Sequence, residues 1–298
     1  MSLKIPGLMT QSKSRTEKNL TVTSFTLDGR RCSVYVSDRR PQSLLNKFSW
    51  PQITADLVAG VGLDQQAAQS GRGGIFFFSG DRAATPLVVR QYRHGGFLRF
   101  LRGARFFSRK RFLAELKIHN QAAELGIPVP AAVAVIVTTE ERSSFFVNGY
   151  FATLRLPDCG TLPEFLQEAD SKTRLMIFAR VGEYLKKLHE NGIYYTDMQV
   201  KNILVTRSGI PYFIDFDKSR ESEGPLSDVL RSANLRRFWR SLAKYSERGG
   251  CLTESDRAAF LIAYAADSKA YGKFYQQLQR GLFRRRLFYR LGWLINRS

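Results

Sequence analysis

Residues 194–218 read YYTDMQVKNILVTRSGIPYFIDFDK, and this stretch decides the fold. Asp197 lies five residues before Asn202, and Asp215 lies thirteen residues after Asn202. Two short apolar runs, ILV and YFI, stand between Asn202 and Asp215 and are separated by the turn signal Ser208–Gly209. Short apolar runs on either side of a turn predict a β-hairpin. Because a hairpin returns the chain to its start, we expect Asp215 beside Asn202, with Asp197 on the preceding loop.

This spacing suits phosphoryl transfer. In kinase-like enzymes one Asp meets the acceptor hydroxyl, while an Asn and a second Asp hold Mg²⁺ on the phosphates of ATP. We therefore assign Asp197 as the catalytic residue and Asn202 and Asp215 as metal ligands, with ATP and Mg²⁺ as cofactors. Residues 195–202 are called the catalytic loop below. The alternative is a polar loop on an ordinary αβ domain, where Asp and Asn serve as turn formers.

The net charge, the apolar runs and the cysteines limit the classes of protein and of binding partner that fit this sequence. The 298 residues include 46 Lys and Arg against 26 Asp and Glu, a net charge of +20 that calls for an anionic partner or surface. Nucleic acid, phospholipid headgroups and a polyphosphorylated substrate all qualify on charge alone. The sequence holds no apolar run of bilayer length, and its N-terminus lacks the apolar segment of a secretory signal. The three scattered cysteines suggest a reducing cytosol.

Strand and helix signals change character near residue 156. Before it, strand patterns surround a short helical segment after Pro41 and a helical pattern over residues 108–125, which stops at Gly126. After it, the pattern is mostly helical. This predicts an α+β, protein-kinase-like fold of two lobes, an antiparallel β N-lobe with one helix and a mostly helical C-lobe. The expected segments are a disordered basic leader (1–21), a β-rich N-lobe that covers the nucleotide (22–156), a helical C-lobe with the catalytic loop (157–270) and a basic amphipathic C-terminal helix (271–298).

Phosphate-binding groups are expected in the N-lobe. Glycines at a strand turn let backbone N–H groups approach phosphate oxygens, and three precede an expected strand: Gly71, Gly73 and Gly74. The strand over residues 86–92, joined to the one before it by residues 81–86, should carry a cation, and Arg90 stands there. Its planar fork can bind phosphate oxygens, and Glu115 on the helix would orient it. The alternatives are plain turn glycines, a solvent-facing Arg90 and a solvated Glu115.

Two clusters mix basic and aromatic residues, at 93–111 and in the tail GLFRRRLFYRLGWLINRS (281–298). On a helix, the tail leucines form one stripe flanked by arginines, a composition typical of an interfacial membrane helix. A helix packed on the C-lobe with a solvated basic face is equally compatible. Single-stranded nucleic acid ranks third, because no nucleic-acid fold motif accompanies the clusters. The short segment 217–224 favours a small-molecule or glycolipid acceptor over a docked peptide.

Several motifs together resemble the lipopolysaccharide kinases, closest to the 3-deoxy-D-manno-octulosonic acid (Kdo) kinases. The motifs are VVRQYRHGG (88–96), ELGIPVP (124–130), YTDMQVKNILV (195–205), DFDK (215–218) and NLRRFWRSLAK (234–244). The resemblance covers residues 70–244. It implies an ATP-dependent enzyme, peripheral on the cytoplasmic side of the bacterial inner membrane, that phosphorylates a hydroxyl of Kdo on a lipid A precursor. Its substrate would be an anionic glycolipid, with membrane contact through the basic amphipathic segments. We expect a monomer and no nucleic-acid partner.

By position, the resemblance makes Asp197 the catalytic residue, Asn202 and Asp215 the metal ligands and Arg90 the phosphate-binding cation. The chain departs from the family at Tyr195, where His is usual two residues before the catalytic Asp. A Tyr can keep the packing of that His and one hydrogen bond. The alternatives are a heptose kinase of the same family, a small-molecule phosphotransferase of the aminoglycoside kind, and an inactive membrane- or glycolipid-binding pseudokinase, which Tyr195 would favour.

Overall fold

The computed structural model describes residues 10–17, 20–37, 46–62, 74–93, 105–140 and 145–265. The chain divides into two units. Unit 1 comprises residues 1–117 and 130–155, and unit 2 comprises residues 118–129 and 156–298. Each unit therefore takes residues from two separate stretches of the chain. Helix α5 (Lys110–Glu124) runs across the division at residue 117.

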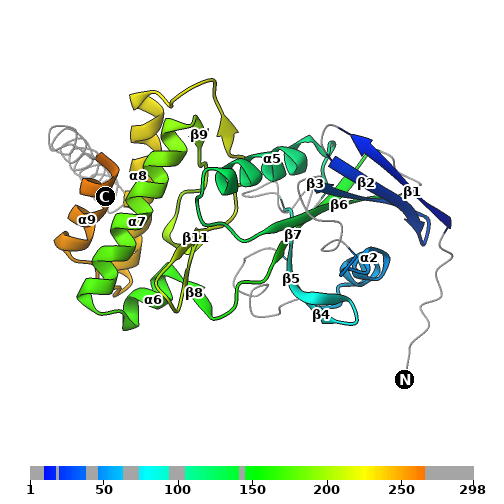
Figure 1. Cartoon of the computed structure of the whole chain (residues 1–298), viewed down its shortest axis with the longest axis horizontal. Helices are drawn as coiled ribbons and strands as arrows, with labels where there is room; N and C mark the ends of the chain where they lie inside the picture. The colour runs from blue at the N-terminus through cyan, green and yellow to red at the C-terminus, as the bar shows by residue number, and fades with distance from the viewer. Residues whose placement is uncertain are drawn as a thin grey trace, which may run out of the picture. The chain divides into compact units, whose positions relative to one another are not determined.

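In the described part of unit 1, seven strands form one antiparallel sheet (Figure 1). Across the sheet their order is β1 (Thr10–Glu17), β2 (Leu20–Leu27), β3 (Arg30–Ser37), β6 (Ala132–Glu140), β7 (Val147–Leu154), β5 (Ala83–Gln91) and β4 (Ile75–Gly80). The β2–β3 turn uses Asp28 and Gly29, both with positive φ, as a tight hairpin turn requires. The sheet confirms the predicted antiparallel β N-lobe.

Alternation along the strands sends side chains to two apolar clusters. Val34 and Val36 of β3 join the cluster that includes Ile53 and Leu57 of α2 (Trp50–Ala59), a helix in the region after Pro41 where the sequence indicated a short helical segment. Tyr35, between them, joins the cluster that includes Phe112 and Leu116 of α5. Because successive residues of a strand face opposite sides of a sheet, the two helices cover opposite faces.

Two strand boundaries differ from the prediction. Strand β1 lies inside the segment expected to be a disordered leader, and it pairs with β2 at the sheet edge. Its sequence, TQSKSRTE, has no apolar alternation, so only the backbone ladder reveals it. Strand β5 begins at Ala83 rather than at Pro86, which makes the β4–β5 turn tighter than expected. Pro86 is exposed within β5, and its carbonyl accepts a hydrogen bond from the Arg155 backbone N–H.

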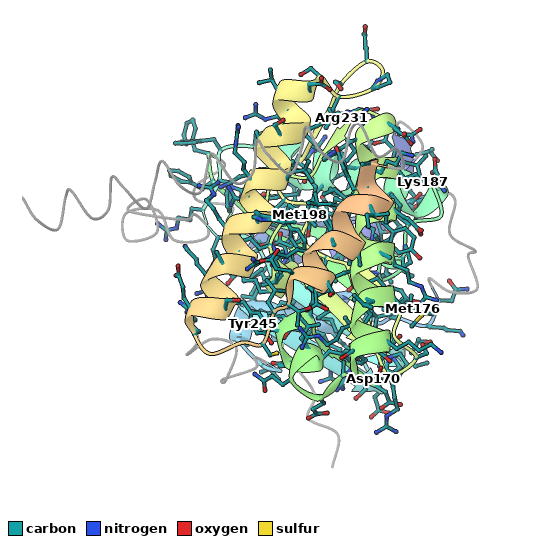
Figure 2. The ribbon with its side chains drawn as sticks, turned by 90° about the vertical axis from the view of Figure 1, so that its left-hand side faces the viewer. Asp170, Met176, Lys187, Met198, Arg231 and Tyr245 are labelled. Atoms are coloured by element: carbon teal, nitrogen blue, oxygen red, sulfur yellow. The ribbon has the colours of Figure 1, made fainter. Side chains whose placement is uncertain are left out.

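Unit 2 is mostly helical in its described part. Its helices are α6 (Leu162–Glu168), α7 (Ser171–Glu190), α8 (Asp228–Glu247), α9 (Glu254–Ala265) and the short 3₁₀ helix η1 (Val200–Asn202). Its short strands are β8 (Cys159–Thr161), β9 (Ile193–Tyr194), β10 (Ile203–Thr206), β11 (Pro211–Phe213) and β12 (Arg220–Glu221). Figure 2 shows helices α7, α8 and α9 next to one another, with Met176 and Lys187 along α7 and Arg231 and Tyr245 along α8. This confirms the predicted helical C-lobe.

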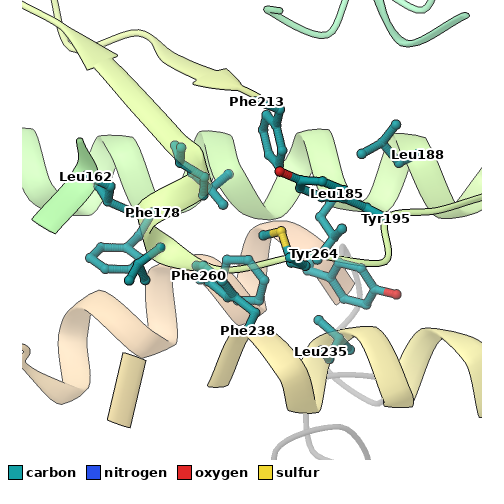
Figure 3. Packing of buried hydrophobic residues seen from close by; sticks show 14 of the residues in the cluster. Leu162, Phe178, Leu185, Leu188, Tyr195, Phe213, Leu235, Phe238, Phe260 and Tyr264 are labelled. Atoms are coloured by element: carbon teal, nitrogen blue, oxygen red, sulfur yellow. The ribbon is translucent and has the colours of Figure 1, made fainter. Parts of the chain in front are cut away.

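The core of unit 2 joins the long helices to the catalytic loop. Phe238 of α8 and Phe260 of α9 pack with ring centroids 5.0 Å apart. Tyr195, Met198 and Val200 of the catalytic loop are buried in the same cluster. Figure 3 shows Tyr195 close to Phe213 of β11, with Phe238 of α8 and Phe260 of α9 below them. The loop is therefore part of the packed core rather than a surface excursion.

Several predicted segments lie outside the described residues. They include the amphipathic tail, residues 271–298, and residues 94–104 of the first basic cluster. Within the described ranges, none of the helices combines the length and the apolar character needed to span a bilayer.

Candidate active site

Hairpin β10–β11 places the two predicted metal ligands at neighbouring positions. In its antiparallel register Ile203 lies opposite Phe213. One position beyond, the backbone N–H of Ile214 donates to the carbonyl of Asn202 at 3.0 Å. Asp215 follows directly and has φ of 65°, in the left-handed region where Asp is enriched. The hairpin therefore brings Asn202 and Asp215 to one end, as their spacing indicated, while their role as ligands stays a prediction.

The carboxylate of Asp197 is held at both oxygens. Asn202 Nδ2 donates to Asp197 Oδ2 at 3.0 Å and also to the Asp197 carbonyl at 2.8 Å. Arg237 Nη2 donates to Asp197 Oδ1 at 2.5 Å and forms an ion pair with it. Gln199 Nε2 donates to the same oxygen. The two residues assigned as base and metal ligand are thus in direct contact.

These partners decide the charge of Asp197. Burial alone would raise the pKa of its carboxyl group, but hydrogen bonds from Arg237, Asn202 and Gln199 and the positive charge of Arg237 together outweigh that effect. The net pKa lies below the ordinary value for Asp. With 27% of its side chain exposed, Asp197 is an ionised and accessible carboxylate at neutral pH.

The Tyr195 hydroxyl lies at the end of the hairpin where its two strands leave Asn202 and Ile214 side by side. It donates to the carbonyl of Ile214 and lies 3.3 Å from the carbonyl of Asn202. The Tyr195 ring is fully buried and stacks on Phe216 at 4.8 Å. The residue that replaces the usual His therefore bridges the backbone next to both predicted metal ligands.

His189, at the last turn of α7, is a buried structural group. Its Nδ1 lies 2.8 Å from the hydroxyl of Tyr264, and its Nε2 lies 2.9 Å from Asn234 Oδ1. Asn234 Nδ2 in turn donates to the carbonyl of Tyr195 at 2.6 Å. Burial, reinforced by the charge of Arg231 against a weaker opposing bond from Asn234, lowers the pKa of His189 from 6.5 to about 4. The imidazole is therefore neutral at physiological pH.

In unit 1, Arg90 and Glu115 form the ion pair that the sequence suggested. Arg90 Nη2 lies 2.7 Å from Glu115 Oε1 and 2.8 Å from Oε2. The Glu115 side chain is 1% exposed and that of Arg90 is 25% exposed. Arg90 also lies over the ring of Tyr92 at 4.8 Å. A buried acid thus orients an arginine whose side chain is partly exposed, and phosphate binding by Arg90 stays a prediction.

Of the three glycines predicted to approach phosphate, the structure describes only Gly74. Gly74 is buried at the start of β4, where its carbonyl accepts from the Gln91 backbone N–H at 2.8 Å. A Cβ there would lie 3.1 Å from Gln91 Oε1 and from Phe76 Cε2, so a larger residue would require both side chains to shift slightly. Gly71 and Gly73 lie outside the described residues. Their contact with phosphate stays a prediction.

Sequence reasoning gave no role to Arg237, Asn234 or Gln199. Arg237 lies forty positions from Asp197, and in a chain of net charge +20 an arginine on a helix reads as a solvated charge. A signal was present in the NLRRFWRSLAK motif, which helped to indicate the family but carried no spacing that pointed to the catalytic loop.

Comparison with known proteins points to one family. A model of the Lipopolysaccharide kinase (Kdo/WaaP) family matches residues 65–264, more than half of the chain. A 3-deoxy-D-manno-octulosonic acid kinase of Photobacterium profundum is 28% identical over 178 residues, 58% of this chain and 71% of that protein. The enzyme of the same name from Vibrio cholerae serotype O1 is 25% identical over 199 residues, 65% of this chain and 80% of that protein.

A solved structure, described as WaaP in complex with acyl carrier protein, is also similar. Its TM-score is 0.48 at 15% sequence identity, covering 70% of this chain and 83% of that chain.

Proposed function

Because this chain belongs to the lipopolysaccharide kinase (Kdo/WaaP) family, we propose that it transfers the γ-phosphate of ATP to a hydroxyl of Kdo on a lipid A precursor. The contact between Asp197 and Asn202 at the end of the β10–β11 hairpin carries this proposal. It joins a candidate base to a candidate metal ligand in a buried, hydrogen-bonded loop. The names of the curated relatives support Kdo as the acceptor sugar.

Asp197 would act on the acceptor. Its carboxylate would accept a hydrogen bond from the sugar hydroxyl and direct the oxygen towards the γ-phosphorus. As the new O–P bond forms, the bond from γ-phosphorus to the bridging oxygen breaks and its electron pair leaves with ADP. The hydroxyl proton passes to Asp197 late in the step. Because positioning and charge neutralisation supply most of the rate in phosphoryl transfer, a carboxylate of low pKa is adequate.

Asn202 and Asp215 fit a magnesium ion in chemical type. Asn202 Nδ2 donates both of its hydrogen bonds to Asp197, which orients the amide so that Oδ1 is the atom able to meet a cation. Asp215 would supply carboxylate oxygens from the neighbouring position of the hairpin. Oxygen ligands of this kind suit Mg²⁺, which would neutralise charge on the phosphates.

In unit 1, Arg90 would bind phosphate oxygens of ATP. Glu115 keeps the guanidinium in place through contacts from both carboxylate oxygens to Nη2, and 25% of the Arg90 side chain stays exposed to solvent. Arg90→Lys would keep the charge but lose the planar fork, so we expect weaker ATP binding rather than a changed acceptor.

The test is turnover with ATP and Mg²⁺ on purified Kdo-bearing lipid A precursor, read by mass spectrometry. We expect a phosphate-sized mass gain on the Kdo portion with the wild-type protein. Asp197→Ala should lose at least about 10²-fold in rate, because a positioned base contributes about 10²–10⁴-fold. Asp215→Ala should abolish metal-dependent turnover as well.

The acceptor and the chemistry can fail separately. A gain on a heptose-bearing acceptor but not on Kdo would make the protein a heptose kinase, and a gain on small aminoglycosides alone would reject a glycolipid substrate. ATP binding without transfer to any of these acceptors would reject the assigned acceptors. No ATP binding at all would favour a pseudokinase.

A further inference from the structure

One face of α8 contacts the catalytic loop at successive points. Asn234, Arg237 and Ser241 are spaced at i, i+3 and i+7, which places them on the same side of a helix. Their bonds run in the same order along both segments: Asn234 Nδ2 to the Tyr195 carbonyl (2.6 Å), Arg237 Nη2 to Asp197 Oδ1 (2.5 Å), and the Val200 N–H to Ser241 Oγ (2.9 Å). Three positions along this face of α8 thus contact three positions along the catalytic loop in the same order.

The contact between Asn234 and the Tyr195 carbonyl is held by a second layer of buried hydrogen bonds. Since Asn234 Nδ2 is committed to the Tyr195 carbonyl, its Oδ1 faces His189 and accepts a hydrogen bond from Nε2. His189 Nδ1 then accepts from the hydroxyl of Tyr264. Asn234 and His189 are completely buried, and Tyr264 is 2% exposed. An amide with both ends satisfied in the core has one orientation, so the loop backbone at Tyr195 is anchored.

The second contact acts on the catalytic side chain itself. An Asp carboxylate rotates easily about its last bond, because that torsion is broad. Arg237 and Gln199 hold Oδ1, and Asn202 holds Oδ2, which stops the rotation. Of the three donors only Arg237 comes from outside the catalytic loop. It therefore sets the carboxylate relative to the core of unit 2 and not only relative to its own loop.

We propose that Arg237 is the positioning residue for Asp197, which it aligns from α8 while Asn234 and Ser241 hold the loop backbone on either side. The proposal rests on the kinase function assigned above for its effect on turnover, but the alignment itself does not depend on a substrate. Arg236 provides a matched control, since it is the same residue type at the preceding position of α8 and is exposed.

The first experiment needs no acceptor. Hydrogen–deuterium exchange of the full chain would be measured for the peptide that covers residues 195–202. Arg237→Ala and Asn234→Ala should speed exchange there by about tenfold or more, because each removes an anchor and favours local opening. Arg236→Ala should leave it unchanged. If Asn234→Ala fails to fold, Ser241→Ala replaces it and tests the third contact.

The second experiment separates positioning from general stability. With ATP and the acceptor that the wild type uses, Arg237→Ala should lower kcat by about 10²-fold, as expected for a misplaced catalytic group, with KM for ATP little changed. Arg237→Lys should recover part of kcat, because it restores the charge but not the fork. In an Asp197→Asn background, Arg237→Ala should have almost no further effect, because it acts through that carboxylate.

The outcomes distinguish the two proposals. Faster exchange in the Arg237 and Asn234 variants, together with the non-additive loss of kcat, supports the positioning role of Arg237. Unchanged exchange, or a loss of kcat that is as large in the Asp197→Asn background as in the wild type, overturns it. If the wild type phosphorylates no acceptor, the proposed function fails, and the exchange measurement alone decides the role of α8.

Discussion

At the scale of single residues, Tyr195 shows how one side chain can replace another by reaching different atoms. A His would present one ring N–H, whereas the Tyr hydroxyl extends to the carbonyls of both Asn202 and Ile214. Both carbonyls belong to residues adjacent to or part of the candidate metal site. The replacement of His by Tyr therefore changes the hydrogen bonds next to that site. It leaves no cavity in the core, where the Tyr195 ring stacks on Phe216.

Tyr195→Phe tests this support. It keeps the ring but removes the hydroxyl, and it leaves buried carbonyl groups with one hydrogen bond fewer. We expect the free energy of unfolding to fall by about 1–3 kcal/mol. Denaturant unfolding, followed with the phosphotransfer assay, would measure it. Tyr194→Phe is the control, since the Tyr194 hydroxyl has no hydrogen bond within the described residues, and an equal loss in both variants would contradict the bridging role.

How far the sequence predicts the site depends on the separation of its members along the chain. Asp197, Asn202 and Asp215 lie on one hairpin, so their spacing and the turn at Ser208–Gly209 were enough to bring them together. The Arg90–Glu115 pair required only the order of a strand and a helix. Arg237 was not predicted, because its contact with Asp197 depends on how α8 packs, and a surplus of arginines conceals the one that is used.

At the scale of elements, α7 and α9 pack so closely that one position admits no side chain. A Cβ on Gly182 of α7 would lie 2.3 Å from the backbone carbonyl of Phe260 in α9 and 3.1 Å from the backbone nitrogen of Tyr264. Neither atom can move without moving α9. Because Tyr264 also contacts His189, the spacing of the two helices bears on the network behind the catalytic loop.

Gly182→Ala should therefore destabilise the protein. On an isolated helix this change would stabilise by about 1 kcal/mol, since Ala is the better helix former. Overpacking against backbone should reverse the sign and lower the free energy of unfolding by about 1–3 kcal/mol. Thermal and denaturant unfolding would measure it, with Glu183→Ala on the exposed side of α7 as the control. A stabilised Gly182→Ala variant would show that α9 moves freely.

The elements that the sequence did not predict share a physical reason. Strand β1 has polar residues throughout, so its sequence lacks the alternation that marks a half-buried strand. Pro86 was the first residue of the expected strand, yet β5 begins three residues earlier, and Pro86, which lacks an N–H, pairs there through its carbonyl. Both cases depend on backbone pairing with distant strands, which side-chain patterns do not record.

At the scale of the whole molecule, the buried His189 makes the free energy of unfolding depend on pH. Its pKa is about 4 in the folded protein, because it is buried, against 6.5 when exposed. Above pH 6.5 both states are neutral at this residue. Between pH 6.5 and 4 the unfolded chain binds a proton that the folded chain does not. The folded state therefore loses stability as the pH falls through this window.

Acid sensitivity can be assigned to this residue by comparison. The contribution amounts to about 3 kcal/mol between neutral pH and pH 4, from about 1.4 kcal/mol per pKa unit. Denaturant unfolding would be followed at about pH 7, 5.5 and 4.5 for the wild type and for His189→Gln. The difference in stability between the two should narrow as the pH falls, because the variant lacks the titrating group. A constant difference would place the acid sensitivity elsewhere.

Unit 2 is built from two separate stretches of the chain, and this limits where the gene can be divided. Ile118, Ala122 and Ile127 belong to its core, and the Pro128 carbonyl accepts from the Phe213 backbone N–H in β11. A gene fragment that starts at residue 156 would encode the catalytic loop without these partners. To combine this unit with the N-terminal half of a relative, a chimera needs junctions after residues 117, 129 and 155 rather than one crossover. Recombination at a single point would exchange part of the catalytic core along with the sheet.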